Sequence, residues 1–560
     1  MNVNRLNFWQ VLPTALEAIA DAEYVAFDLE MTGIFTRRDH RVADPTLEDV
    51  YRQAREVAKT YQILQFGLTC FHYDGQLQGY RARTFNCDLS PMFVGSTPAD
   101  KVLAKTTDRT VSFSYSSMLF LQSHGFSFER AFAGGIPYLS RTEARDASGV
   151  YLKNNPRDVQ ANMVFDVEGA DMETRRFYAA TRTKISAWLT QESDSLQFVN
   201  ISNPYGGRMT SLQIKLIYQL VETEFRMCRA FTRNNNELMQ VIELEVESDQ
   251  RYWKQRLDRR QEALARQTAF RYIVEALTGG EFANEIDAVL SLGWPVGANG
   301  GLPGVRERLR ALEARLKRRP PVLVGHNQLY DLCFLYQAFV GPLPANAADF
   351  KTEIHRLFPR IVDTKHLASS WPPGAAKQPV AGMVADKNLG ELYGEVARQA
   401  LPSFWSDHGF GYVAGPGSAR AHEAGFDSFM TAVVFTKLSL AKLRDEPQAR
   451  VLPLSISGGG GGVHNIMMAR PSQDPTATAR SLSLFSELNP FAAKPGRPPM
   501  STGCAAAVSE GGWEKLDGTA AADVRRLCCR GRIPEWETPF WARYGNKLHW
   551  RSGESWTLPR

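Results

Sequence analysis

YVAFDLEMTG, residues 24–33, is the stretch that decides the fold. It begins as a continuous apolar run, and such a run predicts a central β-strand buried on both faces. Two further strands are predicted at 63–71 and 80–85, and a helix is predicted over 47–61 between the first two strands. Strands separated by helical patterns favour an α/β layer fold.

The composition is that of an ordinary globular protein. The chain has 560 residues, of which 44% are apolar and 22% charged, and these values exclude a wholly disordered, collagen-like or disulfide-scaffold protein. The net charge of +5 permits a nucleic-acid partner without arguing for one. We find neither a secretory signal nor an apolar run near the ~18 residues that span a bilayer. We therefore expect a protein of the nucleus and/or cytoplasm with no membrane partner.

Two carboxylates end the decisive strand. Asp28 and Glu30 are two residues apart, so on a strand both side chains point to the same face. Burying them is costly unless a cation lies between them, and hard oxygen ligands suit Mg²⁺ or Mn²⁺ rather than zinc. An exposed strand end is the alternative interpretation of this pattern taken alone.

Support comes from VLVGHNQLYDLCFLYQAF, residues 322–339. The stretch reads as a buried strand, a tight turn at Gly325–Asn327 and an amphipathic helix. Asp331 then falls in the first turns of the helix, close to the carboxyl end of the strand, where α/β sheets place ligands. We expect His326 to be a turn residue rather than a catalytic group.

A fourth carboxylate lies in AHEAGFDSFMTAVVF, residues 421–435. Asp427 stands at the opening of a predicted helix, and His422 precedes it by five residues. This spacing lets Asp427 complete an acidic cluster while His422 overhangs it from the preceding loop. With three other carboxylates expected at the same place, His422 becomes the natural general base.

The positive charge is concentrated in two predicted helices. Residues 251–266 carry six basic and two acidic side chains, and residues 306–319 carry seven and two. A solvated helix face and an RNA contact are both open interpretations. Between the first two acidic motifs, residues 214–220 fit an amphipathic helix and residues 239–246 alternate like a strand.

The three acidic motifs together resemble those of the DEDDh superfamily of 3′-to-5′ exonucleases, and the wider sequence is similar to the poly(A)-specific ribonuclease family within it. The stretches that carry the likeness are QFGLTCF (65–71), SSMLFLQSHGF (116–126), GIPYLS (135–140), GPLPANAADFK (341–351), FPRIVDTKHLASS (358–370), HEAGFDSFMT (422–431) and PFWARYGNKL (539–548). The resemblance implies a ribonuclease H-like exonuclease core, a mixed central sheet flanked by helices, interrupted by a small α/β domain of nucleic-acid-binding type.

The resemblance also implies roles for particular residues. Asp28, Glu30, Asp331 and Asp427 would bind two Mg²⁺ ions, for which Mn²⁺ could substitute, and His422 would take a proton from the attacking water. Lys365, Met118 and Phe120 match family positions that contact the substrate, although a pure core role for Phe120 is nearly as well supported. Asp363 is not expected to be a metal ligand; it would either support the ligands from behind or be structural.

The implied domain organisation has five parts. Residues 1–170 and 251–445 would form the nuclease core, and residues 171–250 the inserted domain, in which 212–220 carries the likeness. Residues 446–530, rich in Gly, Pro, Ser and Ala, are predicted to be flexible. Residues 531–560 would hold a closing strand of the core, within TPFWARYGNKLHW (538–550), and a tail. We expect no RNA-recognition module after it, and therefore no cap stimulation by that route.

The expected function is a metal-dependent 3′-to-5′ exoribonuclease that prefers poly(A) tails and releases 5′-AMP, working as a homodimer. One alternative is trimming of the 3′ ends of small non-coding RNAs by the same chemistry. A second is a non-catalytic RNA-binding protein, which would predict a broken acidic set, whereas the set here is intact.

Overall fold

A computed structural model describes most of the chain and divides it into two compact units. The described residues are 1–35, 44–92, 95, 97, 100, 101, 103, 104, 107–153, 165–190, 197–243, 246–287, 301–370, 387–399, 402–410, 422–445, 531–551 and 554–558. Unit 1 comprises Met1–Val94, Arg109–Thr142 and Gln267–Arg560, and unit 2 comprises Gly95–Asp108 and Glu143–Arg266. The predicted inserted domain, 171–250, falls within unit 2, and the predicted flexible segment, 446–530, lies outside the described residues.

Unit 1 is built on a mixed sheet, as predicted. Its strands are β1 Asn2–Val3, β2 Tyr24–Met31, β3 Ile63–Asp74, β4 Gly79–Ser90, β5 Ile136–Pro137, β9 Val322–Gly325, β10 Ile361–Asp363 and β11 Ser403–Ser406. The order is β1-β4-β3-β2-β9-β10, and β5 and β11 also pair with β4. β2, β3 and β4 are antiparallel to one another, whereas β9 and β10 run parallel to β2. The three strands predicted around the first acidic motif are therefore confirmed.

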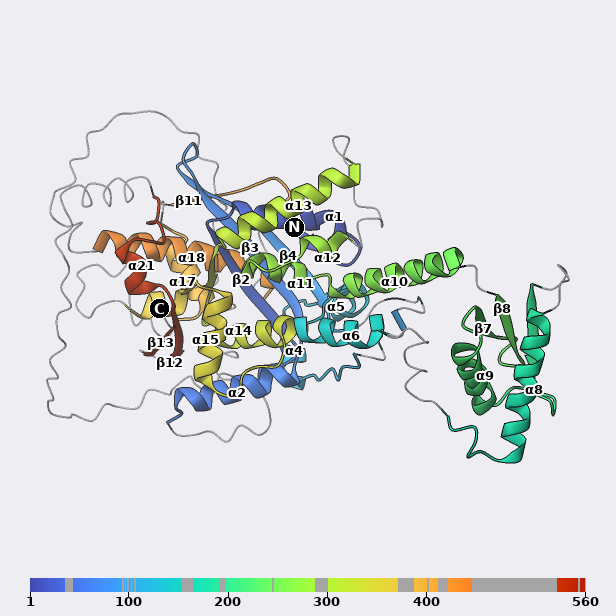
Figure 1. The fold of residues 1–560 in the computed structure, drawn as a ribbon. Coiled ribbons are helices and arrows are strands. Elements are labelled where there is room, and N and C mark those ends of the chain that lie inside the picture. The colour runs from blue at the N-terminus through green and yellow to red at the C-terminus, as the bar shows by residue number, and fades with distance from the viewer. Residues whose placement is uncertain are drawn as a thin grey trace. The chain divides into compact units, whose positions relative to one another are not determined.

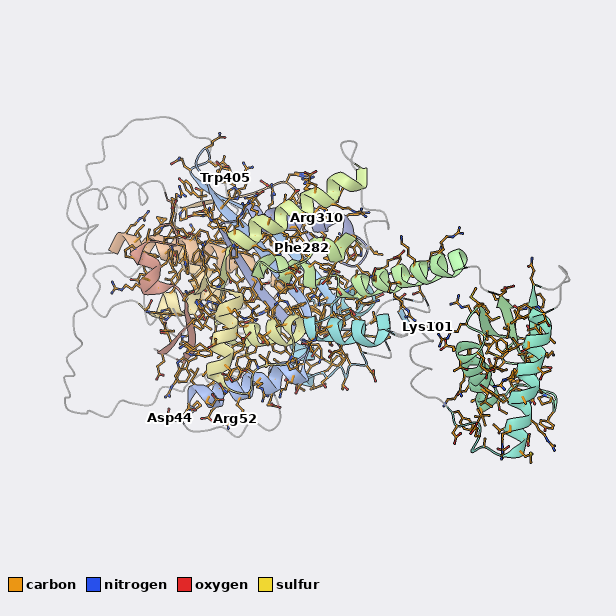
Figure 2. All side chains as sticks on the ribbon, viewed as in Figure 1. Asp44, Arg52, Lys101, Phe282, Arg310 and Trp405 are labelled. Atoms are coloured by element: carbon orange, nitrogen blue, oxygen red, sulfur yellow. The ribbon has the colours of Figure 1, made fainter. Side chains whose placement is uncertain are left out.

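Helices cover both faces of this sheet (Figure 1). One face packs against α1 Phe8–Asp21, α2 Leu47–Thr60, α11 Arg271–Thr278, α12 Ala283–Asp287, α13 Gly301–Arg318, α14 Leu329–Leu335 and α15 Ala347–Leu357. The other packs against α16 Thr364–Ser369, α17 Leu389–Val396, α18 Ala424–Asp445 and α21 Pro539–Tyr544. The core on the α1 face buries Phe282 completely. Trp405, on the short strand β11 at the periphery of the sheet, is 47% exposed (Figure 2).

Strand alternation decides which side chains reach the α18 face. On β2, Val25, Phe27 and Leu29 point into the core on the α1 face, whereas Tyr24 and Ala26 point toward α18. Because side chains alternate along a strand, Asp28 and Glu30 continue the row of Tyr24 and Ala26. The α18 face is thus apolar at one end of β2 and acidic at the other.

The C-terminal stretch differs from the prediction in its first half. Residues 539–544, predicted as part of a short strand, form the helix α21, because Pro539 follows Thr538 and proline is favoured at the first helical position. The strand β12 Lys547–Arg551 begins after this helix and pairs with β13 Glu554–Thr557 in a two-stranded sheet. The N–H of Asn546 donates to the carbonyl oxygen of Ile361 (2.8 Å), which fastens the hairpin beside β10.

The predicted helix over 306–319 is confirmed within α13, and two of its arginines form ion pairs with a neighbouring helix. Arg308 pairs with Glu17 and Arg315 with Asp21, both acids on α1. These two arginines therefore serve contacts inside unit 1. They favour neither of the two interpretations, a purely solvated face or an RNA contact.

Unit 2 contains a three-stranded antiparallel sheet with helices against it. Its strands are β6 Phe198–Ser202, β7 Cys228–Arg233 and β8 Leu238–Glu243, in the order β6-β8-β7. The helices that pack against this sheet are α8 Met172–Leu189 and α9 Ser211–Thr223, and a third long helix, α10 Val246–Thr268, follows β8 in the chain. The predicted helices over 214–220 and 251–266 are confirmed within α9 and α10. The predicted strand is shorter than expected, because it ends at Glu243 and Val246 already begins α10. Among the described residues of the whole chain, none of the helices is both long and apolar enough to cross a membrane.

Candidate active site

The acidic end of β2, which carries Asp28 and Glu30, lies under the first turn of α18. Cross-strand pairing sets Asp28 opposite Gly67 and Glu30 opposite Gln65 on β3. Gly67 and Gln65 lie in turn opposite Asn86 and Asp88 on β4. These side chains share one face of the sheet, and α18 begins directly above Gly67: a Cβ added there would lie 1.7 Å from the carbonyl oxygen of Ala424.

Asp331 reaches the same place from the neighbouring parallel strand. β9 ends at Gly325, and the turn that follows places Asn327 at φ 54°, a left-handed conformation that asparagine tolerates better than most residues. α14 then begins at Leu329, with Asp331 in its first turn. Its negative charge lies close enough to raise the pKa values of both Asp28 and Glu30.

Asp427 and His422 come from the start of α18. His422 adopts φ 70°, so the chain turns sharply before the helix begins at Ala424. One ligand atom each from Glu30, His422 and Asp427 lie within 4.8 Å of one another. Asp427 is buried, and its Oδ1 atom has no hydrogen-bond partner among the described residues. The five predicted catalytic positions are therefore brought together by β2, α14 and the first turn of α18.

The cluster is electrostatically unfavourable without a cation. Burial, followed by the charges of Asp427, Asp331 and Glu30, raises the pKa of Asp28, and burial with the first two of these charges raises that of Glu30. Burial also raises the pKa of Asp331 and of Asp427, each to about 7. Buried carboxylates that repel one another are stabilised when a positive charge binds between them. A buried carboxylate oxygen without a donor fits a hard divalent ion, so the residues present suit Mg²⁺ or Mn²⁺.

The ring of His422 packs against two aromatic side chains, one on α4 Tyr115–Ser123 and one on the residue that ends this helix. The ring centroids of Phe120 and His124 lie 4.6 and 4.3 Å from that of His422, both nearly perpendicular to it. Burial, with a smaller contribution from His124, lowers the pKa of His422 to about 4. His422 is therefore neutral near pH 7 and able to accept a proton.

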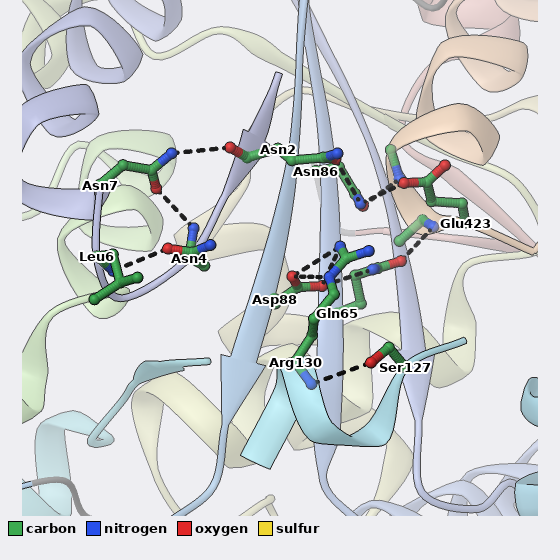
Figure 3. Close-up of polar contacts among 12 residues, drawn as sticks. Asn2, Asn4, Leu6, Asn7, Gln65, Asn86, Asp88, Ser127, Arg130 and Glu423 are labelled. Carbon is green, nitrogen blue, oxygen red and sulfur yellow. Dashed lines mark hydrogen bonds and ion pairs between the residues drawn. The ribbon is translucent and has the colours of Figure 1, made fainter. Parts of the chain in front are cut away.

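Two amide side chains of the sheet cap the start of α18. The N–H of Ala424 donates to Gln65 Oε1 (2.9 Å) and the N–H of Gly425 to Asn86 Oδ1 (3.0 Å). These N–H groups lack partners within the helix, because the first turn of any α-helix leaves its donors unsatisfied. Asn86 Nδ2 also donates to Glu423 Oε1 (2.8 Å), so both ends of this amide hold the segment between His422 and Asp427 (Figure 3).

The Gln65 amide is itself held in orientation. Its Nε2 donates to Asp88 Oδ1 (3.0 Å), and Asp88 accepts a bidentate pair of hydrogen bonds from Arg130 on α5 Phe128–Gly134 (Figure 3). Because Asp88 fixes the donor end of the amide, the oxygen must face Ala424. Our sequence reasoning missed Gln65 and Asn86 as site residues. Their signal is a polar side chain at a buried position within a strand, which requires a specific partner.

Asp363 proves to be a buried backbone anchor, as expected of a structural residue. Its Oδ1 accepts from the N–H groups of Asn327 and Lys365 (both 2.9 Å), and its Oδ2 accepts from that of His549 (3.0 Å) and, more weakly, of Gln328 (3.4 Å). Burial raises its pKa to about 6, although these four donors oppose the rise. The carboxylate joins the turn before Asp331 to β10, α16 and β12.

The three predicted substrate-contact residues have different surroundings. Phe120 packs beside His422, as described above. Lys365 donates from Nζ to the carbonyl oxygen of Lys387 (2.5 Å), and its charge contributes to the low pKa values of His326 and His549. Met118 is half-buried on α4. The substrate contacts of all three stay predictions. His326 bonds the hydroxyl of Thr364 (2.9 Å), in keeping with a turn residue.

Comparisons with known proteins show which family the chain is similar to. The model of the CAF1 family of ribonucleases matches residues 3–435. Poly(A)-specific ribonuclease PARN of Danio rerio is 26% identical over 452 residues, which cover 78% of this chain and 59% of the relative, and that of Homo sapiens is 25% identical over 463 residues, covering 78% and 62%. This chain thus spans about 60% of the length of these two relatives.

Two further matches are proteins with other names. The pre-piRNA 3′-exonuclease trimmer of Bombyx mori is 23% identical over 444 residues, covering 78% of this chain and 71% of the relative. Among solved structures, the Mg²⁺- and Mn²⁺-bound form of S. pombe Pop2p is 12% identical with a TM-score of 0.34, covering 80% of this chain and 93% of that one. The resemblance to poly(A)-specific ribonucleases inferred from the motifs is confirmed by the relatives. Since the family model extends over more than three quarters of the sequence, the chain belongs to the CAF1 family of ribonucleases.

Proposed function

We propose that the chain is a metal-dependent 3′-to-5′ exoribonuclease that shortens poly(A) tails and releases 5′-AMP. The observation that carries the proposal is the convergence of four carboxylates and His422 from three segments of the chain. Within the part of the chain that the structure describes, the buried Oδ1 of Asp427 has no hydrogen-bond donor. The relatives named poly(A)-specific ribonuclease support the choice of substrate.

Asp28, Glu30, Asp331 and Asp427 would hold two Mg²⁺ ions, for which Mn²⁺ could substitute. Held by these residues, such ions would lower the pKa of an attacking water and stabilise the negative charge of the leaving 3′ oxygen. The chain's part is to hold four carboxylates together where β2 meets the openings of α14 and α18. The amides of Gln65 and Asn86 keep the first turn of α18, and with it Asp427, at its distance from β2.

His422 would remove the proton from the attacking water. Its low pKa keeps the ring unprotonated at neutral pH, and its turn conformation holds the ring beside the oxygens of Glu30 and Asp427. Phe120, which packs against that ring, would contact the terminal nucleotide together with Met118, while Lys365 would contact the phosphate backbone. Base stacking on such side chains contributes ~1–3 kcal/mol per base.

The experiment uses 5′-labelled RNA carrying a 3′ oligo(A) tail, incubated with the full chain and Mg²⁺. Parallel reactions contain EDTA, the Asp28→Ala variant, or an RNA with a U tail of equal length. Stepwise shortening that stops near the end of the A-tract, and is lost with EDTA or Asp28→Ala, is the expected result. Equal shortening of both tails would remove the poly(A) preference. No shortening in Mg²⁺, or when Mn²⁺ replaces it, would overturn the proposal in favour of a non-catalytic RNA-binding protein.

A second candidate is trimming of the 3′ ends of small non-coding RNAs by the same chemistry. The similarity to the Bombyx mori pre-piRNA trimmer over 71% of that protein favours it. A small RNA with a mixed-sequence 3′ extension, offered together with an A-tailed RNA of equal length, separates the two. Faster shortening of the mixed extension would select the trimmer.

We further propose that the chain acts as a homodimer in the nucleus and/or cytoplasm. Light scattering tests the first point, and a mass near 62.7 kDa, that of a single chain, would refute it. Imaging of a fluorescent fusion tests the second.

A further inference from the structure

The end of α4 is a closed motif that fixes the position of His124. Gly125, the next residue, has φ 78°, a left-handed conformation that glycine adopts readily. The N–H of Gly125 donates to the carbonyl oxygen of Gln122, and that of Phe126 to the carbonyl oxygen of Leu121, both at 3.0 Å. These two bonds are the Schellman pattern of helix ends. His124 is therefore held as the last residue of a helix rather than as part of a loop.

The imidazole of His124 is turned back along its own helix. Its Nδ1 lies 2.8 Å from the carbonyl oxygen of Phe120 and 3.2 Å from Ser123 Oγ. A carbonyl oxygen can only accept a hydrogen bond, so Nδ1 carries a proton and donates it. The backbone N–H of His124 donates to the same carbonyl oxygen at 3.2 Å. Because backbone and ring share one anchor, the ring has little freedom to rotate.

His124, Phe120 and His422 form a cluster of three rings. The centroids of His124 and Phe120 lie 4.3 Å apart with an interplanar angle of 41°. The ring of His422 meets that of His124 at 71° and that of Phe120 at 75°. Edge-to-face contacts of this kind are a preferred arrangement of aromatic rings. Since the two rings of α4 also contact each other, they act on His422 as a single support.

The orientation of His422 needs such a support. Its backbone at φ 70° is uncommon for a residue with a bulky side chain, and such a conformation persists only where the surroundings hold it. A general base must also keep its nitrogen within hydrogen-bond reach of the attacking water. The other end of α4 is fixed to β2's continuation, because the N–H of Ser114 donates to the carbonyl oxygen of Thr32 (2.8 Å), two residues after Glu30. The support for the His422 ring and the carboxylate of Glu30 thus belong to one framework.

We propose that His124 is a positioning residue: its ring orients the imidazole of His422 toward the water that His422 would deprotonate, and it acts through its shape and not through proton transfer of its own. The inference rests on the proposed function for the role of His422 as the base. It gives a part in the reaction to a residue that the acidic motifs do not contain.

Two substitutions separate the ring of His124 from its hydrogen bond. His124→Phe keeps a planar ring and loses the Nδ1 donor, whereas His124→Asn keeps an N–H donor close to the backbone and loses the ring. In His124→Phe the carbonyl oxygen of Phe120 still accepts from Ser123 Oγ (2.8 Å), so it retains a partner. The matched control is His408→Asn, the same exchange at an exposed histidine of unit 1.

The first assay is single-turnover hydrolysis of an A-tailed RNA by the full chain in Mg²⁺, over a range of protein concentrations. We expect His124→Asn to lower the maximal rate about tenfold, because one aromatic contact favours its geometry by up to about that factor. The half-saturating protein concentration should change less than about twofold, since substrate binding is not affected. His124→Phe should restore the rate and His408→Asn should leave it unchanged, and thermal melting checks that each variant is folded.

A second readout does not depend on hydrolysis. The full chain is labelled with ¹³C in its histidine rings, and the NMR signal of His422 is identified by its loss in His422→Gln. Neighbouring aromatic rings shift the resonances of a ring packed against them. We therefore expect the His422 signal to move toward the position of an unpacked histidine in His124→Asn, and to remain displaced from that position in His124→Phe. If this NMR pattern is found but the wild type hydrolyses no RNA, the proposed function fails and the orientation of His422 by His124 stands.

Three results would overturn the inference. A wild-type rate and an unmoved His422 signal in His124→Asn would mean that His422 needs no ring from His124. An equal loss of rate in His124→Phe and His124→Asn would mean that the imidazole chemistry of His124 is required, and not its shape. A higher half-saturating concentration at an unchanged maximal rate would mean that His124 contacts RNA instead.

Discussion

Gly67→Ala is the substitution that tests most directly whether the sheet positions the proposed catalytic groups at the start of α18, His422 and Asp427. Gly67 lies on β3 between Asp28 and Asn86, directly beneath the backbone of Ala424. The three atoms nearest to a methyl group here all belong to the backbone of Ala424 and Gly425. Its effect must therefore come from the position of the helix.

The structure sets the size of that effect. The new Cβ would lie 1.7 Å from the Ala424 carbonyl oxygen, whereas such contacts essentially never fall below 3.0 Å. The start of α18 must therefore move by at least the difference of 1.3 Å. Misplacement of catalytic groups by about 1 Å can cost ~10²-fold in rate. Overpacking costs ~1–3 kcal/mol of unfolding free energy, of which a better strand residue than glycine returns ~0.5–1 kcal/mol.

The assay is single-turnover hydrolysis of an A-tailed RNA, together with urea unfolding. We expect Gly67→Ala to lower the rate about a hundredfold while it lowers stability by only ~1–2 kcal/mol, too little to unfold the protein. Gly75→Ala is the matched control, because a Cβ there meets nothing within 4 Å. If Gly67→Ala hydrolyses RNA at the wild-type rate, then close contact between β3 and α18 does not position His422 and Asp427.

Three more substitutions follow from the same contacts. Asn86→Ala leaves the N–H of Gly425 without its acceptor, so unfolding free energy should fall by ~1–3 kcal/mol and the hydrolysis rate should fall with it; unchanged denaturation and kinetics would contradict the cap. Asp363→Asn replaces one of the two acceptor oxygens by an NH₂ group, which would face backbone N–H groups that are also donors. The free energy of unfolding in urea should fall by ~1–3 kcal/mol, whereas wild-type stability would mean that the anchor is dispensable. Asp427→Asn removes one of several crowded negative charges, so in EDTA the variant should melt above the wild type. Mg²⁺ should raise the melting temperature of the wild type far more than that of the variant, and parallel responses would refute the metal site.

Local pattern predicted much of the active site, and for a physical reason. The apolar run at 24–27 and the two-residue spacing of Asp28 and Glu30 are properties of one strand, so its position in the sheet and the shared face of the two acids follow from alternation alone. Asp331 and Asp427 were predictable because each stands at the opening of a helix. The resemblance of the three separated motifs to those of one exonuclease superfamily then indicated that the three segments meet.

Contacts between distant parts of the chain could not be predicted in this way. Gln65 and Asn86 cap a helix that begins more than three hundred residues later, and nothing local distinguishes them from other polar strand residues. The C-terminal helix was missed because its aromatic residues suggested a strand, although Pro539 after Thr538 is a helix-start signal. The pairing of α13 arginines with α1 acids likewise needed the fold, since net charge alone does not show which charges face a neighbour.

The pairing of β2 with β9 has a consequence for how the protein is made. The central strand leaves the ribosome early, but its parallel partner, beginning at Val322, is about 300 residues behind it, which at typical elongation rates is a delay of ~15–60 s. Throughout that interval the nascent chain carries Asp28 and Glu30 without Asp331, Asp427 or His422. Under the proposed function, a ribosome-bound fragment would therefore be unable to cut RNA, and the message that encodes the chain would not be exposed to this activity until residues 422–427 had been synthesised.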